Sequence, residues 1–88
     1  MLMNGFFEYL KKERKMSANT LEAYKRDMLQ FAEFEASRDI SDLRQTPGTE
    51  VVAFLLQLKN DGKSAATVNR KLASIRAFYN YLQSIKEV

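Results

Sequence analysis

The chain has 88 residues, a formal net charge of +3 and a pI near 9.3, which together describe one small basic domain. It contains neither cysteine nor histidine, so disulfides, thiol nucleophiles, imidazole bases and zinc sites built on these ligands are excluded. Hydrophobic residues make up 45% and charged residues 28%, a composition typical of globular rather than disordered chains. We expect a single folded domain over residues 1–88, with no cofactor and no metal.

The first predicted element is a short helix from Phe6 to about Lys15. Its apolar side consists of Phe6, Phe7, Tyr9 and Leu10. Its last turn is basic, with Lys11, Lys12, Arg14 and Lys15. Cations at this position complement the helix dipole, so the basic run is either a solvated helix end or a segment that faces phosphate, and the sequence leaves both interpretations open.

A second helix is predicted after Ser17, whose hydroxyl is suited to cap it. Its inward positions follow helical spacing: Leu21, Tyr24, Met28, Phe31 and Ala32. Polar and basic residues lie in its N-terminal half: Asn19, Thr20, Lys25 and Arg26. Backbone N–H groups and small polar side chains at a helix N-terminus can bind phosphate, although such residues also serve simply as caps and surface.

Turn-forming residues interrupt the pattern from Ser37 to Gly48, and we expect Ile40 and Leu43 to pack this loop onto the core. A third, shorter helix then opens at Thr49-Glu50. Its apolar residues are Val51, Val52, Phe54, Leu55, Leu56 and Leu58. Because they cover more than one face, this helix is predicted to be buried on several sides. Gly62 can adopt the left-handed conformation that ends it.

The fourth helix is predicted to begin near Ala65, after an N-cap at Ser64. Its apolar stripe consists of Val68, Leu72, Ile75, Tyr79 and Leu82, and we expect Leu72 at the centre of this stripe. Every charged residue from Gly62 to Lys86 is basic: Lys63, Arg70, Lys71, Arg76 and Lys86. A helix with one buried face and a positive remainder suits a phosphate backbone.

The second and fourth helices open alike, with Ser17-Ala18-Asn19-Thr20 and Ser64-Ala65-Ala66-Thr67. Each is followed by a basic pair, Lys25-Arg26 or Arg70-Lys71. This similarity predicts that the N-terminal segments of the two helices bind one ligand together. With no strands expected and short connections, the chain is predicted to be an all-α, four-helix orthogonal bundle.

No apolar run approaches the roughly 20 residues that span a bilayer, and Met1-Leu2-Met3 is followed by polar Asn4 rather than by a secretory apolar segment. We therefore expect a cytoplasmic protein without membrane contact. The chain ends at Lys86-Glu87-Val88, just beyond the fourth helix, and this end is interpreted as a domain boundary within a longer protein.

Four blocks of the chain, at residues 7–14, 17–31, 51–55 and 62–82, together resemble the N-terminal core-binding domain of tyrosine recombinases. This family includes phage integrases and Xer-type recombinases. The most specific blocks are Ser17-x-Asn19-Thr20-(x)3-Tyr24 and Thr67-x-Asn69-Arg70-x-Leu72. One departure is Glu35, which stands where the family has an apolar residue and predicts an early end or a partly exposed last turn for the second helix.

The resemblance implies a SAM-like bundle that clamps one side of a DNA duplex, with the second and fourth helices facing the major groove. The candidate DNA-binding residues that follow are Ser17, Asn19, Thr20, Lys25, Arg26, Ser64, Thr67, Asn69, Arg70, Lys71, Ser74 and Arg76. Among them, base reading would fall to Asn69, Arg70 or Arg76, because amides and guanidinium groups recognise base edges.

The same resemblance places the family's chemistry in a separate C-terminal domain, so no catalytic residue is assigned here. The four tyrosines lie in apolar helical contexts, where packing is the expected role. The chain is thus predicted to bind double-stranded DNA in support of DNA integration and recombination. The parent would be a recombinase assembling as a tetramer on DNA, and the isolated domain would be monomeric.

Two alternatives remain open from the residues alone. The basic helix could make the chain a helical adaptor for an acidic protein partner. Phe54, Phe78 and Tyr81 could instead form an exposed peptide groove. The sequence does not indicate the DNA target, or whether the parent is a phage integrase, a transposon recombinase or a chromosome-dimer resolvase.

Overall fold

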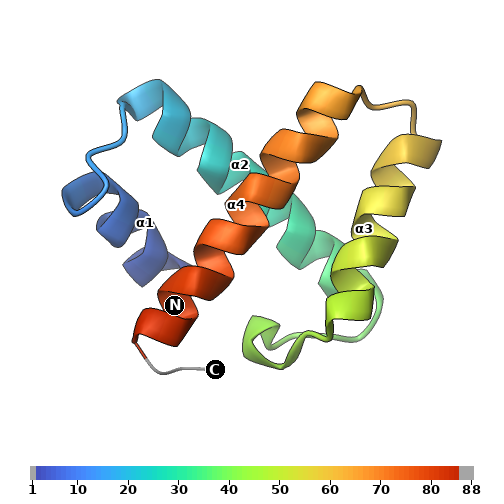
Figure 1. The fold of residues 1–88 in the computed structure, drawn as a ribbon. Helices are drawn as coiled ribbons and strands as arrows, with labels where there is room; N and C mark the ends of the chain where they lie inside the picture. Colours follow the sequence, from blue (N-terminus) through green and yellow to red (C-terminus); the bar gives the residue numbers. More distant parts are fainter. Residues whose placement is uncertain (1, 86–88) are drawn as a thin grey trace.

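The computed structural model describes residues 2–85, and within that range it contains four α-helices, one short 3₁₀ helix and no strand (Figure 1). In chain order they are α1 (Leu2–Lys12), α2 (Ala18–Ser37), η1 (Leu43–Gln45), α3 (Gly48–Asn60) and α4 (Ala65–Ser84). The two long helices, α2 and α4, cross like an X, with α1 on one side and α3 on the other. The all-α, four-helix prediction is confirmed. The expected domain boundary at residues 86–88 lies outside the described range.

Both predicted serine caps are confirmed. Ser17 Oγ accepts a hydrogen bond from the Thr20 backbone N–H at 3.2 Å, and Ser64 Oγ accepts one from the Thr67 N–H at the same distance. Each bond satisfies one of the backbone donors that a helix N-terminus leaves unpaired. Replacing such a cap with alanine typically costs about 1 kcal/mol.

The ends of α2 and α3 share one backbone arrangement. Gly62 closes α3 with a φ of 81°, as predicted, and the N–H that follows it reaches back to Leu58 O at 3.0 Å. Asp39 closes α2 in the same way with a φ of 64°, and Ile40 N–H bonds Glu35 O at 2.9 Å. This is the Schellman pattern, and at Asp39 it forms without the glycine that would have marked it in the sequence.

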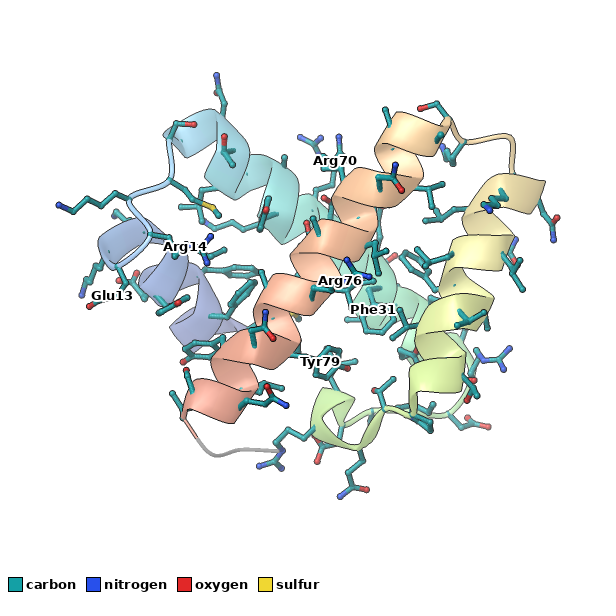
Figure 2. The ribbon with its side chains drawn as sticks, in the orientation of Figure 1. Glu13, Arg14, Phe31, Arg70, Arg76 and Tyr79 are labelled. Atoms are coloured by element: carbon teal, nitrogen blue, oxygen red, sulfur yellow. The ribbon has the colours of Figure 1, made fainter. Side chains whose placement is uncertain are left out.

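The first helix differs from its predicted range at both ends. It begins at Leu2 rather than Phe6, because Met3 joins the core with only 6% of its surface exposed. It ends at Lys12 rather than Lys15, because the chain turns through a left-handed Lys15 with a φ of 50°. Glu13 and Arg14, labelled in Figure 2, therefore lie in the turn that leads to α2.

One hydrophobic core lies around the helix crossing and receives side chains from all four α-helices. Its fully buried apolar residues are Phe6, Leu10, Met28, Phe31, Phe78 and Leu82. The Phe6 and Phe78 rings meet edge to face at 5.3 Å and join α1 to α4, while Phe31 and Phe54 at 5.3 Å join α2 to α3. Leu43 is buried, as predicted for the loop.

The fourth helix is rotated relative to the predicted stripe. Leu72 and Tyr79 are only partly buried, whereas Phe78, absent from the predicted stripe, is fully buried. The expectation that Leu72 is the central core residue is therefore wrong. The rotation brings Lys71 and Ser74 inward, where they meet an acid on α2.

The third helix buries one face and not several. Phe54 and Leu58 are buried, but Val52 and Leu56 are 55% and 54% exposed. The reason is its position at the outer edge of the crossing, where only one side meets α2 and α4 (Figure 1). Because Phe54 and Phe78 are buried, the alternative of an exposed aromatic peptide groove is also wrong.

The early end that Glu35 predicted for α2 is wrong, because the helix runs on to Ser37. The last turn is partly exposed, as predicted, at Ala36 and Ser37, but Glu35 itself is completely buried. Beside it, Arg38 forms a two-pronged ion pair with Glu50 of α3, at 2.5 and 2.9 Å. Among the described residues, neither carboxyl oxygen of Glu35 has a hydrogen-bond partner.

Candidate nucleic-acid interface

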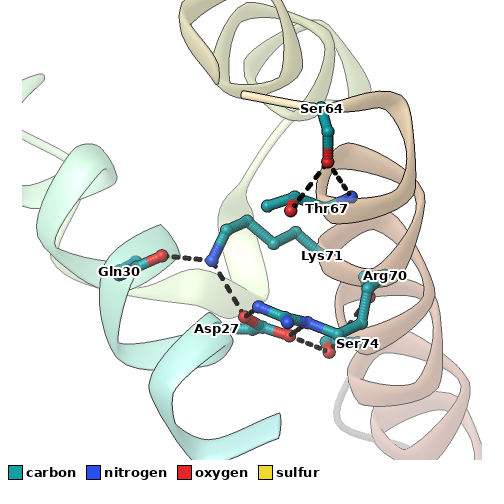
Figure 3. Close-up of polar contacts among 7 residues, drawn as sticks. All are labelled: Asp27, Gln30, Ser64, Thr67, Arg70, Lys71 and Ser74. Atoms are coloured by element: carbon teal, nitrogen blue, oxygen red, sulfur yellow. Dashed lines mark hydrogen bonds and ion pairs between the residues drawn. The ribbon is translucent and has the colours of Figure 1, made fainter. Parts of the chain in front are cut away.

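A buried carboxylate lies where α2 and α4 cross. Asp27 of α2 accepts hydrogen bonds from Arg70 Nη2 at 2.9 Å and Nε at 3.1 Å (Figure 3). It also accepts one from Lys71 Nζ and one from Ser74 Oγ, each at 2.9 Å. Three side chains of α4 therefore converge on one side chain of α2.

The electrostatics of Asp27 follow from these contacts. Burial by itself would raise the pKa of its carboxyl, but the hydrogen bonds from Arg70, Lys71 and Ser74 outweigh burial, and the pKa is lowered. In return, the hydrogen bond to Asp27 raises the pKa of Arg70. Asp27 is therefore ionised at neutral pH. The fourth helix has no acid of its own, and Asp27 of α2 supplies the negative charge that pairs with its basic residues.

Two predicted DNA-binding residues lie inside the protein. Lys71 is 4% exposed and Ser74 is fully buried. The Lys71 ammonium donates to Gln30 as well as to Asp27, and Ser74 also donates to Arg70 O at 3.3 Å. The prediction that Lys71 and Ser74 lie on the surface is wrong. A buried carboxylate requires hydrogen-bond donors, and these two residues supply them.

The other contacts define a polar surface that we call the α2–α4 seam: Asn19, Arg26 and Gln30 from α2, with Thr67 and Arg70 from α4. Gln30 meets Lys71 across the crossing, and Arg26 and Asn19 lie one and three turns before it on the same side of α2. All except Thr67, which is half-buried, are exposed. Four of the five were predicted from the sequence, and the structure brings them to one side of the helix pair.

Arg70 is the centre of this seam. Its side chain is 43% exposed although two of its nitrogens bind Asp27. A guanidinium carries five N–H donors, so the Nη1 edge keeps its donors for a ligand. Figure 2 shows Arg70 in the notch between the N-terminal halves of α2 and α4.

Two predicted cations lie elsewhere. Arg76 faces α3, where it lines a cavity of about 500 Å³ with Gly48 and Val51. Lys25 faces α1, with Nζ 5.8 Å from the centre of the Phe7 ring and 3.7 Å from Glu22 Oε1. The seam, Arg76 and Lys25 thus lie on three different sides of the helix pair.

The remaining predicted residues lie at helix starts and on the outside of α4. Ser17 and Ser64 are engaged as caps, and their hydroxyls also bond Thr20 Oγ1 at 2.9 Å and Thr67 Oγ1 at 3.1 Å. In Figure 1 the N-terminal ends of α2 and α4 lie at the same end of the molecule. Asn69 is exposed and precedes Arg76 by two turns.

All four tyrosines are at least partly buried: Tyr9, Tyr24, Tyr79 and Tyr81. The Tyr79 hydroxyl donates to Leu43 O at 2.8 Å, and burial, with the nearby charges of Glu35 and Asp42, raises its pKa. A raised pKa makes a phenol a poorer nucleophile at neutral pH. The Tyr9 and Tyr81 rings pack on each other at 5.2 Å.

Asp27 and Gln30 were not identified from the sequence as site residues. A usable signal existed for Asp27, which is the acid that helical spacing places among the apolar residues Tyr24, Met28 and Phe31. An acid in that position needs cations from another element, and the acid-free fourth helix is the evident source. Gln30 carried no such signal.

Comparison with known proteins identifies the family of the chain. Residues 3–86 match the family described as phage integrase, N-terminal SAM-like domain. The chain is 43% identical over 87 residues to a candidate tyrosine recombinase of Caldanaerobacter subterraneus subsp. tengcongensis, which covers 99% of this chain and 30% of that protein.

Two Xer recombinases are also similar. The chain is 38% identical to tyrosine recombinase XerD of Oceanobacillus iheyensis over 91% of its length, and 40% identical to XerC of Listeria monocytogenes over 92%. It spans 27% of each of these relatives. No solved structure matches the chain significantly.

None of the helices in the described range is both long and apolar enough to cross a membrane. The family match does not favour the alternative of an adaptor for an acidic protein. With residues 3–86 matched and recombinases as relatives, the resemblance seen in the sequence is confirmed, and the chain belongs to the phage integrase N-terminal SAM-like domain family of tyrosine recombinases.

Proposed function

We propose that this chain is the DNA-binding domain of a site-specific tyrosine recombinase and that it holds duplex DNA with α2 and α4. The observation that carries the proposal is the α2–α4 seam, where Arg26 and the half-exposed Arg70 share one side with amide and hydroxyl groups. Phosphate contacts of this kind fix the position of a protein on a duplex.

The residues divide by chemistry. Arg26 and Arg70 would neutralise phosphates, and the exposed starts of α2 and α4 would add backbone and hydroxyl donors. Asn69 and Gln30 carry amides, which pair with adenine edges in a major groove. Within residues 2–85, Arg26 has no intramolecular hydrogen bond or ion pair, so binding DNA would cost it no existing contact.

Strand cleavage and joining would then belong to a part of the parent protein that this chain does not span, since it covers at most 30% of the relatives described above. A tetrameric assembly on DNA would likewise be a property of that parent. Alone, with one contact face, the domain should bind DNA near the non-specific range of about 10⁻⁴–10⁻⁶ M at physiological salt.

The test is a fluorescence anisotropy titration of a labelled duplex with the wild type and with Arg26→Ala. Each lost phosphate contact should weaken binding and lower the salt slope by about one. Arg44→Ala removes a cation of η1, at the opposite end of the molecule from the starts of α2 and α4 (Figure 1), and is the matched control. Equal affinity of Arg26→Ala and wild type, or an equal loss for Arg44→Ala, would contradict the proposal.

Incubation with a nicked suicide duplex, followed by denaturing electrophoresis, tests whether the chain binds DNA without cleaving or joining it. A stable phosphotyrosyl link needs an activated tyrosine beside cations, and the tyrosines described above are partly buried against the apolar core. We expect no DNA-shifted protein band. Such a band would show that the chain itself can form a covalent bond to DNA.

A further inference from the structure

We infer that Asp27 is a positioning residue for DNA binding: it holds the guanidinium of Arg70 in one orientation, with the Nη1 edge directed to the ligand. The inference rests on the proposed function of the α2–α4 seam. It gives a role in recognition to a negatively charged residue that itself has only 1% of its surface exposed and cannot touch DNA.

The geometry supports this role in two ways. Arg70 bonds Asp27 through Nε and Nη2, and two parallel bonds fix both the position and the plane of a guanidinium, whereas one would leave it free to rotate. Asp27 is in turn fixed by Lys71 and Ser74, so the whole group is tied to the crossing of the two helices (Figure 3).

Positioning has an energetic consequence for binding. An unrestrained arginine side chain loses rotamer freedom when it binds a phosphate, and a side chain that is already ordered loses less. The network also holds Gln30, because the Lys71 ammonium binds both Gln30 and Asp27. Two members of the seam are therefore ordered by one buried carboxylate before DNA arrives.

For substitution of Asp27, positioning and simple electrostatics predict changes in DNA affinity of opposite sign. Asp27→Asn raises the formal net charge from +3 to +4, and by charge alone it should tighten DNA binding. If Asp27 positions Arg70, the same substitution should weaken binding by about tenfold. Glu33→Gln makes the same charge change at an exposed position of α2 and is the matched control, expected to bind as tightly as wild type or tighter.

The experiment measures duplex affinity by anisotropy at a temperature where circular dichroism shows each variant folded. A purely structural Asp27 would lower the melting temperature but leave the affinity of the folded domain intact. Affinity of Asp27→Asn equal to or above that of wild type would overturn the inference. If Arg26→Ala also binds like wild type, the proposed function fails instead.

A second variant keeps the test decisive if Asp27→Asn does not fold. Arg70→Lys retains the charge and can still reach Asp27, but it lacks the two-pronged geometry. We expect about tenfold weaker binding with an unchanged salt slope. Binding equal to wild type would show that charge alone, and not orientation, is what Arg70 contributes.

Discussion

Two buried acids on α2 have opposite environments. Asp27, at the crossing with α4, receives hydrogen bonds from three side chains, and its pKa is lowered. Glu35, about two turns further on, has no hydrogen-bond partner among the described residues. Burial and then the charge of Glu50 raise the pKa of Glu35, and the charge of Arg38 offsets this only in part.

The difference shows that burial alone does not decide what an acid does to a fold. At Asp27 the donors of α4 compensate the lost hydration, and the acid links the two helices of the proposed DNA surface. At Glu35 the cation whose charge acts on the carboxyl, Arg38, is already bound to Glu50, so lost hydration is not replaced. We therefore expect Asp27 to stabilise the crossing and Glu35 to destabilise the corner between α2 and α3.

The largest expected effect is from Asp27→Ala. It leaves the buried Lys71 ammonium with only Gln30 as a partner, and breaking a buried ion pair in this way costs about 3–5 kcal/mol. Urea unfolding followed by circular dichroism gives the free energy of unfolding. Glu33→Ala, exposed on the same helix, should change it by less than about 0.5 kcal/mol, and similar values for both variants would mean that Asp27 is not a structural link.

Glu35→Met should act in the opposite direction. Replacing a buried acid that lacks partners by an apolar side chain of similar length should stabilise the domain at pH 7 by about 1–3 kcal/mol. Thermal and urea unfolding both measure this gain. A loss of stability would reveal that Glu35 has a partner in solution.

The pH dependence separates the two acids. Glu35 has a higher pKa in the folded chain, so it binds a proton on folding, and stability should fall as pH rises from about 4.3 through that higher value. Asp27 has a lower pKa when folded, so its contribution is complete above about pH 4 and is lost as pH falls toward the lowered value.

Unfolding free energies at a series of pH values test these signs, with a slope of at most about 1.4 kcal/mol per pH unit for one group. Glu35→Met should abolish the decline on the side above pH 4.3 and leave the acid side unchanged. If the variant kept that decline, a group other than Glu35 would be responsible for it.

The smallest expected effect is from Ser74→Ala, which removes one of the donors to Asp27 but keeps the charged partners. We expect a loss of about 1 kcal/mol. A loss as large as that of Asp27→Ala would mean that the network fails as a unit rather than by parts.

Helix number, the serine caps and the glycine stop were predictable because they depend on local chemistry and spacing. The rotation of α4 was not, because Leu72 fits an apolar stripe better than Lys71 does, and the partners of the residues that turn inward, Asp27 for Lys71 and Phe6 for Phe78, lie on other helices. For the same reason Lys71 and Ser74 were wrongly expected on the surface, whereas Arg26, Arg70 and Asn19 were correctly expected there.

The exposure of Val52 and Leu56 on α3 could not be predicted from the sequence either, because apolar composition does not show how many neighbouring helices a helix has. Glu35 was recognised as unusual, but helical spacing within α2 did not show that its side chain is completely buried. Tertiary contacts, not local propensity, decided each of these positions.

The most direct test of the central claim is an NMR titration of the ¹⁵N-labelled chain with a short duplex. The account predicts that the largest chemical-shift changes occur along the α2–α4 seam, at Asn19, Arg26, Gln30, Thr67 and Arg70, and diminish as salt is added. Val52 and Leu56, on the exposed side of α3, should not respond. Changes centred on α3, or none at a duplex concentration of about 1 mM, would contradict the assignment of the seam as the DNA-binding surface.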